Sequence, residues 1–212
     1  MNGPGFSNQA PENHVFVIDD DESSRESIKA LLDPMRAQVK TFESAEAFLA
    51  EYKEERPACL VVDQRMPGMG GIQLLELLRH RNCFVSFVLM TAYPNTRSTV
   101  RAIQGGAIDL LEKPCDPEEL WERIQLGLKL DLQRCKREAE RLEAVRRFES
   151  LSESEREVAR LLCDGHANKV IAAKLELGLR TIEARRASIM RKFQVDSVAA
   201  MLRVWLRAHD EY

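Results

Sequence analysis

Between residues 14 and 130 the apolar residues fall into two kinds of block. Short continuous runs, rich in valine, isoleucine and leucine, are typical of parallel strands that are buried on both faces. Longer segments, in which apolar residues recur every three or four positions, are typical of amphipathic helices. The predicted strands span 14–19, 39–42, 59–63, 84–90 and 107–111, and the predicted helices span 23–32, 44–52, 72–80 and 95–104, with another beginning at Pro117. Because strand and helix alternate five times, we expect a doubly wound, five-stranded parallel α/β sheet.

The helical spacing continues beyond this α/β pattern. Apolar residues recur at positions 120, 124, 128, 132, 135, 139, 142 and 145. From Leu128 onward the spacing approaches that of a coiled coil, which would join two copies of the chain. The alternative is the helix of a monomer that lies against its own domain. The segment holds fewer than the three to four heptads that would decide between the two.

Residues 151–206 have the pattern of a compact, all-helical domain. Ser152 is expected to cap its first helix, with Glu155 completing a capping box and Gly165 ending the helix. Further helices are expected at 169–175, closed by Gly178, at 180–193 and at 197–205. We therefore divide the chain into a disordered leader (1–13), an α/β domain (14–130), a linker helix that is a candidate coiled coil (131–147) and a four-helix domain (148–212).

Composition narrows the class of protein. None of the 212 residues belongs to an apolar run near the roughly 18 residues that span a bilayer. The polar residues 1–13 lack the features of a signal peptide, so we expect a cytoplasmic protein without membrane contact. Five cysteines without C-x-x-C spacing argue against a disulfide framework or a zinc site. Residues 1–130 carry 14 Lys and Arg against 20 Asp and Glu, whereas residues 151–212 carry 11 against 9, which suggests two modules with different partners.

Polar residues follow the predicted strands. Asp19 and Asp20 end the first strand, Asp63 the third and Thr91 the fourth, and Lys113 follows the fifth. The carboxyl ends of parallel strands meet at one edge of the sheet, where ligands bind. Grouped carboxylates suit Mg²⁺, and a Lys and a Thr can bind phosphoryl oxygens, so Asp63 is a candidate nucleophile that would form an acyl phosphate. Any one of these residues alone is more often a helix cap or a turn residue.

Four segments carry a closer resemblance at these strand ends: Val17–Asp20, Val61–Gly71, Met90–Ala92 and Gly106–Pro114. With these segments, residues 14–130 resemble the receiver domain of bacterial two-component response regulators, which has a flavodoxin-like fold.

The resemblance implies particular roles for these residues. A sensor histidine kinase would phosphorylate Asp63. Mg²⁺, or Mn²⁺ in its place, would be held by Asp20, Asp63 and the backbone carbonyl of Arg65, with Asp19 acting mainly through water. Thr91 and Lys113 would bind the phosphoryl group, and the Lys113–Pro114 bond would be cis.

The sequence departs from the receiver pattern at two positions. Leu110 stands where receivers usually have the Tyr or Phe that turns inward when the Thr moves, so only packing of Leu110 would report the state. Cys115 stands where an aromatic residue usually follows the Lys-Pro pair. Neither departure removes the chemistry expected of Asp63.

The third helix of the C-terminal domain is basic. Such a helix fits the major groove of DNA, and its N-terminal half reaches the base edges. Four residues would lie on or near the exposed face, namely Thr181, Glu183, Ala184 and Ala187, with Glu183 able to accept a hydrogen bond from cytosine. Five others could reach phosphates: Arg180, Arg185, Arg186, Arg191 and Lys192. On composition alone, a helical bundle with a solvated basic face is the more common explanation.

Four further segments favour DNA binding: Leu151–Val158, Gly165–Ala172, Arg180–Arg186 and Ile189–Lys192. With them, residues 148–207 resemble the LuxR/FixJ-type helix-turn-helix. The resemblance implies that Lys169, beside Asn168, touches the DNA backbone and that the helix from Thr181 reads the groove. Many relatives have His where Arg185 stands. The combined layout resembles the FixJ/NarL family, and Ala184–Arg186 resembles its FixJ branch.

These features together favour a transcription factor that is switched by phosphorylation and is not an enzyme. Phosphorylation of Asp63 would promote a homodimer on double-stranded promoter DNA or free the DNA-binding helix, and RNA polymerase is a candidate further partner. The alternative is a constitutive regulator that uses its receiver domain only as a dimerisation scaffold, which Leu110 favours. A hydrolase is disfavoured, because the strand ends hold no Ser/His/Asp arrangement and no base besides the metal-binding acids.

Overall fold

The computed structural model describes residues 13–35 and 37–209. Of these described residues, those up to Cys135 form one compact unit and those from Lys136 form another. A single long helix, α5 (Pro117–Glu149), runs through this boundary. No helix within the described ranges combines the length and the apolar character needed to cross a membrane.

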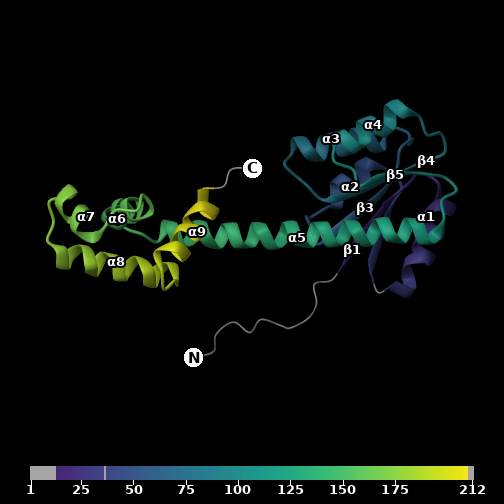
Figure 1. Ribbon diagram of the computed structural model, residues 1–212. Coiled ribbons are helices and arrows are strands. Elements are labelled where there is room, and N and C mark those ends of the chain that lie inside the picture. The colour runs from purple at the N-terminus through teal and green to yellow at the C-terminus, as the bar shows by residue number, and fades with distance from the viewer. Residues whose placement is uncertain (1–12, 36, 210–212) are drawn as a thin grey trace. The chain divides into compact units, whose positions relative to one another are not determined.

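The first unit is the expected doubly wound parallel sheet (Figure 1). Its strands are β1 (His14–Ile18), β2 (Gln38–Phe42), β3 (Ala58–Asp63), β4 (Ser86–Thr91) and β5 (Asp109–Glu112), paired in the order β2-β1-β3-β4-β5. Its helices are α1 (Glu22–Leu32), α2 (Ala45–Glu51), α3 (Gly71–His80), α4 (Thr96–Gln104) and the first part of α5, with a 3₁₀ turn, η1, at Asp33–Met35. The predicted fold class is therefore confirmed.

Alternate residues of the strands divide the core into two layers. One face of the sheet, with Leu60 and Phe87, packs with Phe48 of α2 and Leu74 of α3. The opposite face, which includes Val61, packs with α1 and α5 in a second cluster that includes Ile124. Because successive strand residues point to opposite faces, a continuous apolar run can fill both layers.

The last two strands begin later than the sequence pattern predicts. β4 was expected from residue 84 and β5 from residue 107, but they begin at Ser86 and Asp109. The side chain of Arg79 donates hydrogen bonds to the backbone carbonyls of Cys83, Val85, Gly105 and Gly106. These carbonyls belong to the loops before the two strands, so their hydrogen bonds are satisfied by a side chain and not by the sheet.

Helix α5 contains only part of the predicted coiled-coil seam on an open surface. Leu128, where the seam was expected to begin, is buried against the sheet of the first unit. Leu142, further along, is 45% exposed, and Ala144 beside it is buried. The first part of the helix therefore lies against its own domain, as one of the two alternatives predicts. Leu142 remains exposed and could pair with a second copy of the chain.

The second unit contains α6 (Glu153–Cys163), α7 (Asn168–Lys174), α8 (Leu179–Phe193) and α9 (Val198–His209). The Ser152–Glu155 capping box and the left-handed Gly165, at φ +82°, are as expected. Gly178 differs from the expectation, because it precedes α8 as its N-cap at φ −63°. The turn after α7 instead places Glu176 in the left-handed region, at φ 54°.

Candidate functional site

Four of the predicted residues converge at the carboxyl edge of the sheet. Asp19 follows β1, Asp63 and Thr91 end β3 and β4, and Lys113 follows β5. β1 and β4 both pair with β3, so their ends lie on either side of Asp63. Asp19, Asp63 and Thr91 are all buried, with exposures of 2%, 8% and 1%. The parallel topology alone therefore brings together residues that are up to 94 positions apart in the chain.

Lys113 joins the two buried carboxylates. Its Nζ lies 2.6 Å from Oδ2 of Asp19 and 2.5 Å from Oδ1 of Asp63. Its backbone N–H donates to the carbonyl of Thr91 at 2.8 Å, which fixes the start of this side chain. The Lys113–Pro114 peptide bond is cis, which confirms the expectation. The ammonium group thus offsets the charge of two carboxylates that would otherwise repel each other and be disfavoured as ions by burial.

Burial and this ion pair oppose each other in their effects on pKa. Burial raises the pKa of Asp19, and the hydrogen bonds from Lys113 and from the backbone N–H of Asp21 only partly offset it. Burial acts to lower the pKa of Lys113, but the hydrogen bonds to Asp19 and Asp63 outweigh it and the net pKa is raised. Lys113 is therefore held firmly as a cation at the strand ends.

The Asp63 carboxylate is fixed on both sides. Its Oδ2 accepts a hydrogen bond from the backbone N–H of Arg65 at 2.5 Å, while Oδ1 contacts Lys113. The hydroxyl oxygen of Thr91 accepts from the backbone N–H of Tyr93 at 3.2 Å, which leaves its own proton available to a ligand. The guanidinium of Arg65 lies over the ring of Tyr93, 4.9 Å from its centroid. A nucleophile, a cation and a hydroxyl donor are thus assembled at one edge.

Two predicted residues stand apart from this group. Asp20 is exposed, and its backbone carbonyl accepts a hydrogen bond from Arg25. Leu110 is partly buried and packs against the core layer that contains α2 and α3. Within the described ranges, no three or more His, Cys, Asp or Glu side chains are grouped so that they could hold a metal ion. The expected cluster of three carboxylates is therefore not formed.

The residues present nevertheless fit Mg²⁺ in their chemistry. Mg²⁺ sites commonly use one or two carboxylates, with water and phosphate oxygens completing the shell. Asp19 and Asp63 supply two such carboxylates, each with one oxygen paired to Lys113. Asp20 would need to turn inward to join them.

The residues expected to bind DNA are arranged around α8. Ile182, Ile189 and Phe193 bury one side of this helix in the core of the second unit. Arg180, Thr181, Glu183, Ala184, Ala187 and Arg191 are exposed, while Arg185, Arg186 and Lys192 are half-buried. Positions 180, 184, 187 and 191 follow helical spacing, so small residues lie between two arginines on one face. Such a face permits close approach to a nucleic acid.

Lys192, which was expected to reach a phosphate, also makes contacts within its own domain. Its Nζ donates to the carbonyl of Ser150 at 2.8 Å and to Oε2 of Glu155 at 2.6 Å. Ser188 donates to the other carboxylate oxygen of Glu155 at 2.7 Å. These contacts tie α8 to α6, so the ammonium of Lys192 is engaged within the domain. The capping-box pattern identified Glu155, but nothing in the spacing indicated its contact with a residue 37 positions away.

A groove of about 490 Å³ lies beside α8. Asn168, Lys169, Glu183 and Arg186 line it, and so does His166, which the sequence did not single out. The Nε2 atom of His166 lies 2.8 Å from Nζ of Lys174. The groove therefore brings together predicted DNA contacts from α7 and α8.

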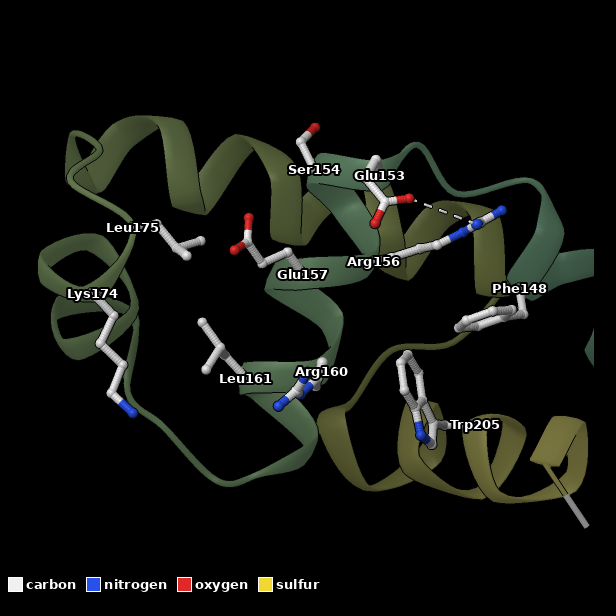
Figure 2. Close-up of a pocket in the computed structure, with 10 residues that line it drawn as sticks. All are labelled: Phe148, Glu153, Ser154, Arg156, Glu157, Arg160, Leu161, Lys174, Leu175 and Trp205. Carbon is white, nitrogen blue, oxygen red and sulfur yellow. Dashed lines mark ion pairs between the residues drawn. The ribbon is translucent and has the colours of Figure 1, made fainter.

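A second, larger hollow of about 800 Å³ lies over α6, and Figure 2 shows the residues that line it. Phe148 and Trp205 meet there edge to face at 5.0 Å, and the guanidinium of Arg156 lies 5.3 Å from the ring of Phe148. Leu161 and Leu175 add apolar surface, and charged side chains surround it. The hollow includes none of the residues expected to bind DNA.

Comparison with known proteins gives both halves of the chain a family. Residues 15–125 match the response regulator receiver domain, and residues 149–205 match the bacterial regulatory proteins of the luxR family. The transcriptional regulatory protein FixJ of Bradyrhizobium diazoefficiens is 36% identical over 195 residues, which cover 92% of this chain and 95% of FixJ. The response regulator protein TodT of Pseudomonas putida is 31% identical over 196 residues, which cover 92% of this chain and 86% of TodT.

Solved structures give the same result. The structure of response regulator StyR superposes with a TM-score of 0.86 at 36% identity and covers 92% of this chain and 99% of StyR. Full-length FixJ from B. japonicum superposes with a TM-score of 0.57 at 35% identity and covers 94% of this chain and 98% of FixJ.

Proposed function

This chain belongs to the FixJ/NarL-type response regulators, which join a receiver domain to a LuxR-type DNA-binding domain, and on that premise we propose that phosphorylation of Asp63 controls its binding to promoter DNA. A sensor histidine kinase is the proposed donor. The contact of Lys113 with both Asp19 and Asp63 carries this proposal, because it places a fixed positive charge beside a buried nucleophile.

The proposed reaction transfers a phosphoryl group between two side chains. A carboxylate oxygen of Asp63 forms a bond to phosphorus while the bond from phosphorus to the kinase imidazole nitrogen breaks, and the electron pair stays on that nitrogen. Such a transfer needs positioning and charge neutralisation more than covalent assistance. Lys113 would pair with the phosphoryl oxygens, and the hydroxyl of Thr91 would donate a hydrogen bond to one of them.

A divalent cation, Mg²⁺ or Mn²⁺, would neutralise the acidic edge and the incoming phosphoryl charge. Asp19, Asp63, the backbone carbonyl of Arg65 and an inward-turned Asp20 are the groups that would hold it. Chelation of the cation is therefore expected to stop phosphorylation.

We divide the chain into a receiver at 14–130, a linker helix at 131–147 and a DNA-binding domain at 148–212. DNA recognition is assigned to the last of these. Arg180 and Arg191 would contact phosphates at the two ends of the exposed face of α8, and Ala184 and Ala187 would approach the bases. The groove beside α8 adds four further candidates: Asn168, Lys169, Glu183 and Arg186. Thr181 and Arg185 complete the set, while Lys192 stabilises the domain. We expect a homodimer when Asp63 is phosphorylated, a cytoplasmic location and RNA polymerase as a further partner.

A second candidate function has one specific observation in its favour. Leu110 packs on an apolar layer in place of an aromatic residue, which suits a regulator that binds DNA without a switch. In that case the receiver domain would serve only as a dimerisation scaffold. Equal affinity for DNA before and after phosphorylation would support this alternative.

The decisive experiment measures phosphoryl uptake and DNA binding on one sample. Acetyl phosphate with Mg²⁺ should raise the intact mass of the wild-type chain by one phosphoryl group and strengthen its binding to promoter DNA. Asp63→Asn should abolish both effects, and EDTA should abolish the mass increase. Asp33→Asn, at an exposed carboxylate outside the site, is the matched control and should behave as wild type. A wild-type chain that takes up no phosphoryl group would sink the proposal.

A further inference from the structure

The two strands that end at Asp63 and Thr91 share a feature at their opposite ends. β3 begins at Ala58 and β4 begins at Ser86, and both first residues are hydrogen-bonded to helix α5. The carboxyl ends of these strands therefore carry the phosphoryl site, while their amino ends are hydrogen-bonded to the helix that continues into the second unit. We call these two groups of hydrogen bonds, made by Asp131 and by Ser86 with Arg134, the fastenings.

The first fastening is a buried carboxylate on α5. Asp131 is fully buried, and its Oδ2 accepts from the backbone N–H of Ala58 at 2.8 Å and from Nε of Arg56 at 3.0 Å. Its Oδ1 accepts from Nη2 of Arg56 at 2.6 Å. A buried charge is stable only when it is paired and hydrogen-bonded, so these contacts hold Asp131 at the start of β3.

The second fastening involves the start of β4. The hydroxyl of Ser86 donates to the backbone carbonyl of Gly127 at 2.7 Å. Nη1 of Arg134 donates to the carbonyl of Phe84 at 2.7 Å and to Oγ of Ser86 at 3.3 Å. Gly127, Asp131 and Arg134 are spaced by four and three positions, so they occupy one face of α5.

The fastened segment ends where the first unit ends. Arg134 is followed by Cys135, the last residue of that unit, and α5 continues to Glu149. Leu110 replaces the aromatic reporter that receivers usually carry, and the contacts at the amino ends of β3 and β4 form a route that does not depend on that residue. β3 and β4 each have a hydrogen-bonded strand on both sides, so a continuous ladder joins the end of each strand at the phosphoryl site to its end at α5.

We propose that Asp131, Ser86 and Arg134 are positioning residues that pass the phosphorylation state of Asp63 and Thr91 to the linker helix through β3 and β4. This inference rests on the proposed function and deepens it by naming the route from the phosphoryl site to DNA binding. A phosphoryl group on Asp63, bound by Thr91, shifts the positions of the two strands. The hydrogen bonds of the fastenings pass that shift to α5. By reciprocity, bound DNA strengthens retention of a ligand at Asp63.

The test compares DNA affinity with and without beryllofluoride, a phosphoryl mimic, in the full chain with Mg²⁺. Three variants weaken the fastenings: Ser86→Ala, Asp131→Asn and Arg134→Gln. The control is Glu138→Gln, which removes a carboxylate from the same helix beyond the fastened segment. In each fastening variant the ratio of the two affinities should fall by about fivefold or more, towards one, while acetyl phosphate still adds one phosphoryl group. Glu138→Gln should keep the wild-type ratio.

The outcomes separate this inference from the function on which it rests. Fastening variants that take up the phosphoryl group and keep the wild-type ratio would overturn the inference and leave the proposed function intact. A wild-type ratio of one would overturn both. If circular dichroism shows that Asp131→Asn does not fold, the ratio measured for Ser86→Ala tests the inference, because this variant removes only a hydroxyl group.

Discussion

Glu155 has two structural roles in one side chain. Its carboxylate accepts from the backbone N–H of Ser152 at 2.8 Å, which completes the cap of α6. The same carboxylate accepts from Ser188 and Lys192 of α8. Burial opposes ionisation of Glu155, but these hydrogen bonds together outweigh it and lower its pKa to about 2. The helix that would read DNA is therefore held to its domain by an ionised carboxylate.

This pKa predicts an acid-sensitive DNA-binding domain. The folded pKa of Glu155 is below the unfolded value near 4.5, so ionised Glu155 contributes stability above pH 4.5. The contribution, on the order of 3 kcal/mol, is lost as the pH falls from 4.5 towards 2. Urea denaturation followed by Trp205 fluorescence, in a Trp121→Phe background, should show this loss in the wild type. Glu155→Gln should be less stable at neutral pH and less pH-dependent, whereas the exposed control Glu157→Gln should follow the wild type.

Among individual residues, the sequence predicted those whose roles follow from their place at the end of a strand. Asp19, Asp63, Thr91 and Lys113 each lie at a strand end, and parallel topology brings strand ends together. The roles of Lys192 and Asp131 were not predictable, because each depends on a partner more than 30 positions away on another element. No spacing rule connects such pairs.

Helix α5 packs closely on the sheet at Gly127. A Cβ atom on this residue would lie 2.7 Å from Sγ of Cys59, 2.9 Å from Cδ1 of Ile108 and 3.3 Å from Cβ of Ser86. Glycine inside a helix is usually unfavourable by about 0.5–1 kcal/mol relative to alanine. Its presence here is explained by close packing, because the neighbouring atoms leave no room for a methyl group.

Gly127→Ala should therefore destabilise the receiver, although alanine is the better helix former. Overpacking costs about 1–3 kcal/mol, which exceeds the gain in helix propensity. Urea denaturation at neutral pH, followed by Trp121 fluorescence, should show a net loss of roughly 1–2 kcal/mol. Lys129→Ala, at an exposed position on the same helix, should leave stability near that of the wild type. A more stable Gly127→Ala variant would contradict this account of the packing.

Periodicity predicted the existence and order of the elements, because it reports burial directly. It was less successful where loops are shaped by distant side chains. Arg79 satisfies the carbonyls of two loops and delays the start of β4 and β5. Gly178 was assigned to the end of α7, but the left-handed residue after that helix is Glu176. A glycine marks a turn, but its identity does not say which helix the turn serves.

The whole chain combines an acidic receiver with a weakly basic DNA-binding domain. A single copy offers few phosphate contacts from α8, chiefly Arg180 and Arg191 at the ends of its exposed face. Affinity for DNA depends strongly on the number of phosphates neutralised, so a second copy on the same DNA raises it sharply. The exposed Leu142 of α5 is available for pairing two copies. These features support our proposal that phosphorylation acts through a homodimer.

A dimer predicts that DNA binding depends on the helical phase of the two half-sites. Two copies related by a two-fold axis bind half-sites about 10 base pairs apart, on one side of the duplex. With beryllofluoride and Mg²⁺, inserting about 5 base pairs between half-sites should weaken binding severely, because the second site then lies on the opposite side. A further 5 should restore part of the affinity. Asp63→Asn should bind weakly and lack this phase dependence. If the ligated wild type binds all spacings equally and as tightly as one half-site, it binds as a monomer, and phosphorylation must then act by freeing α8.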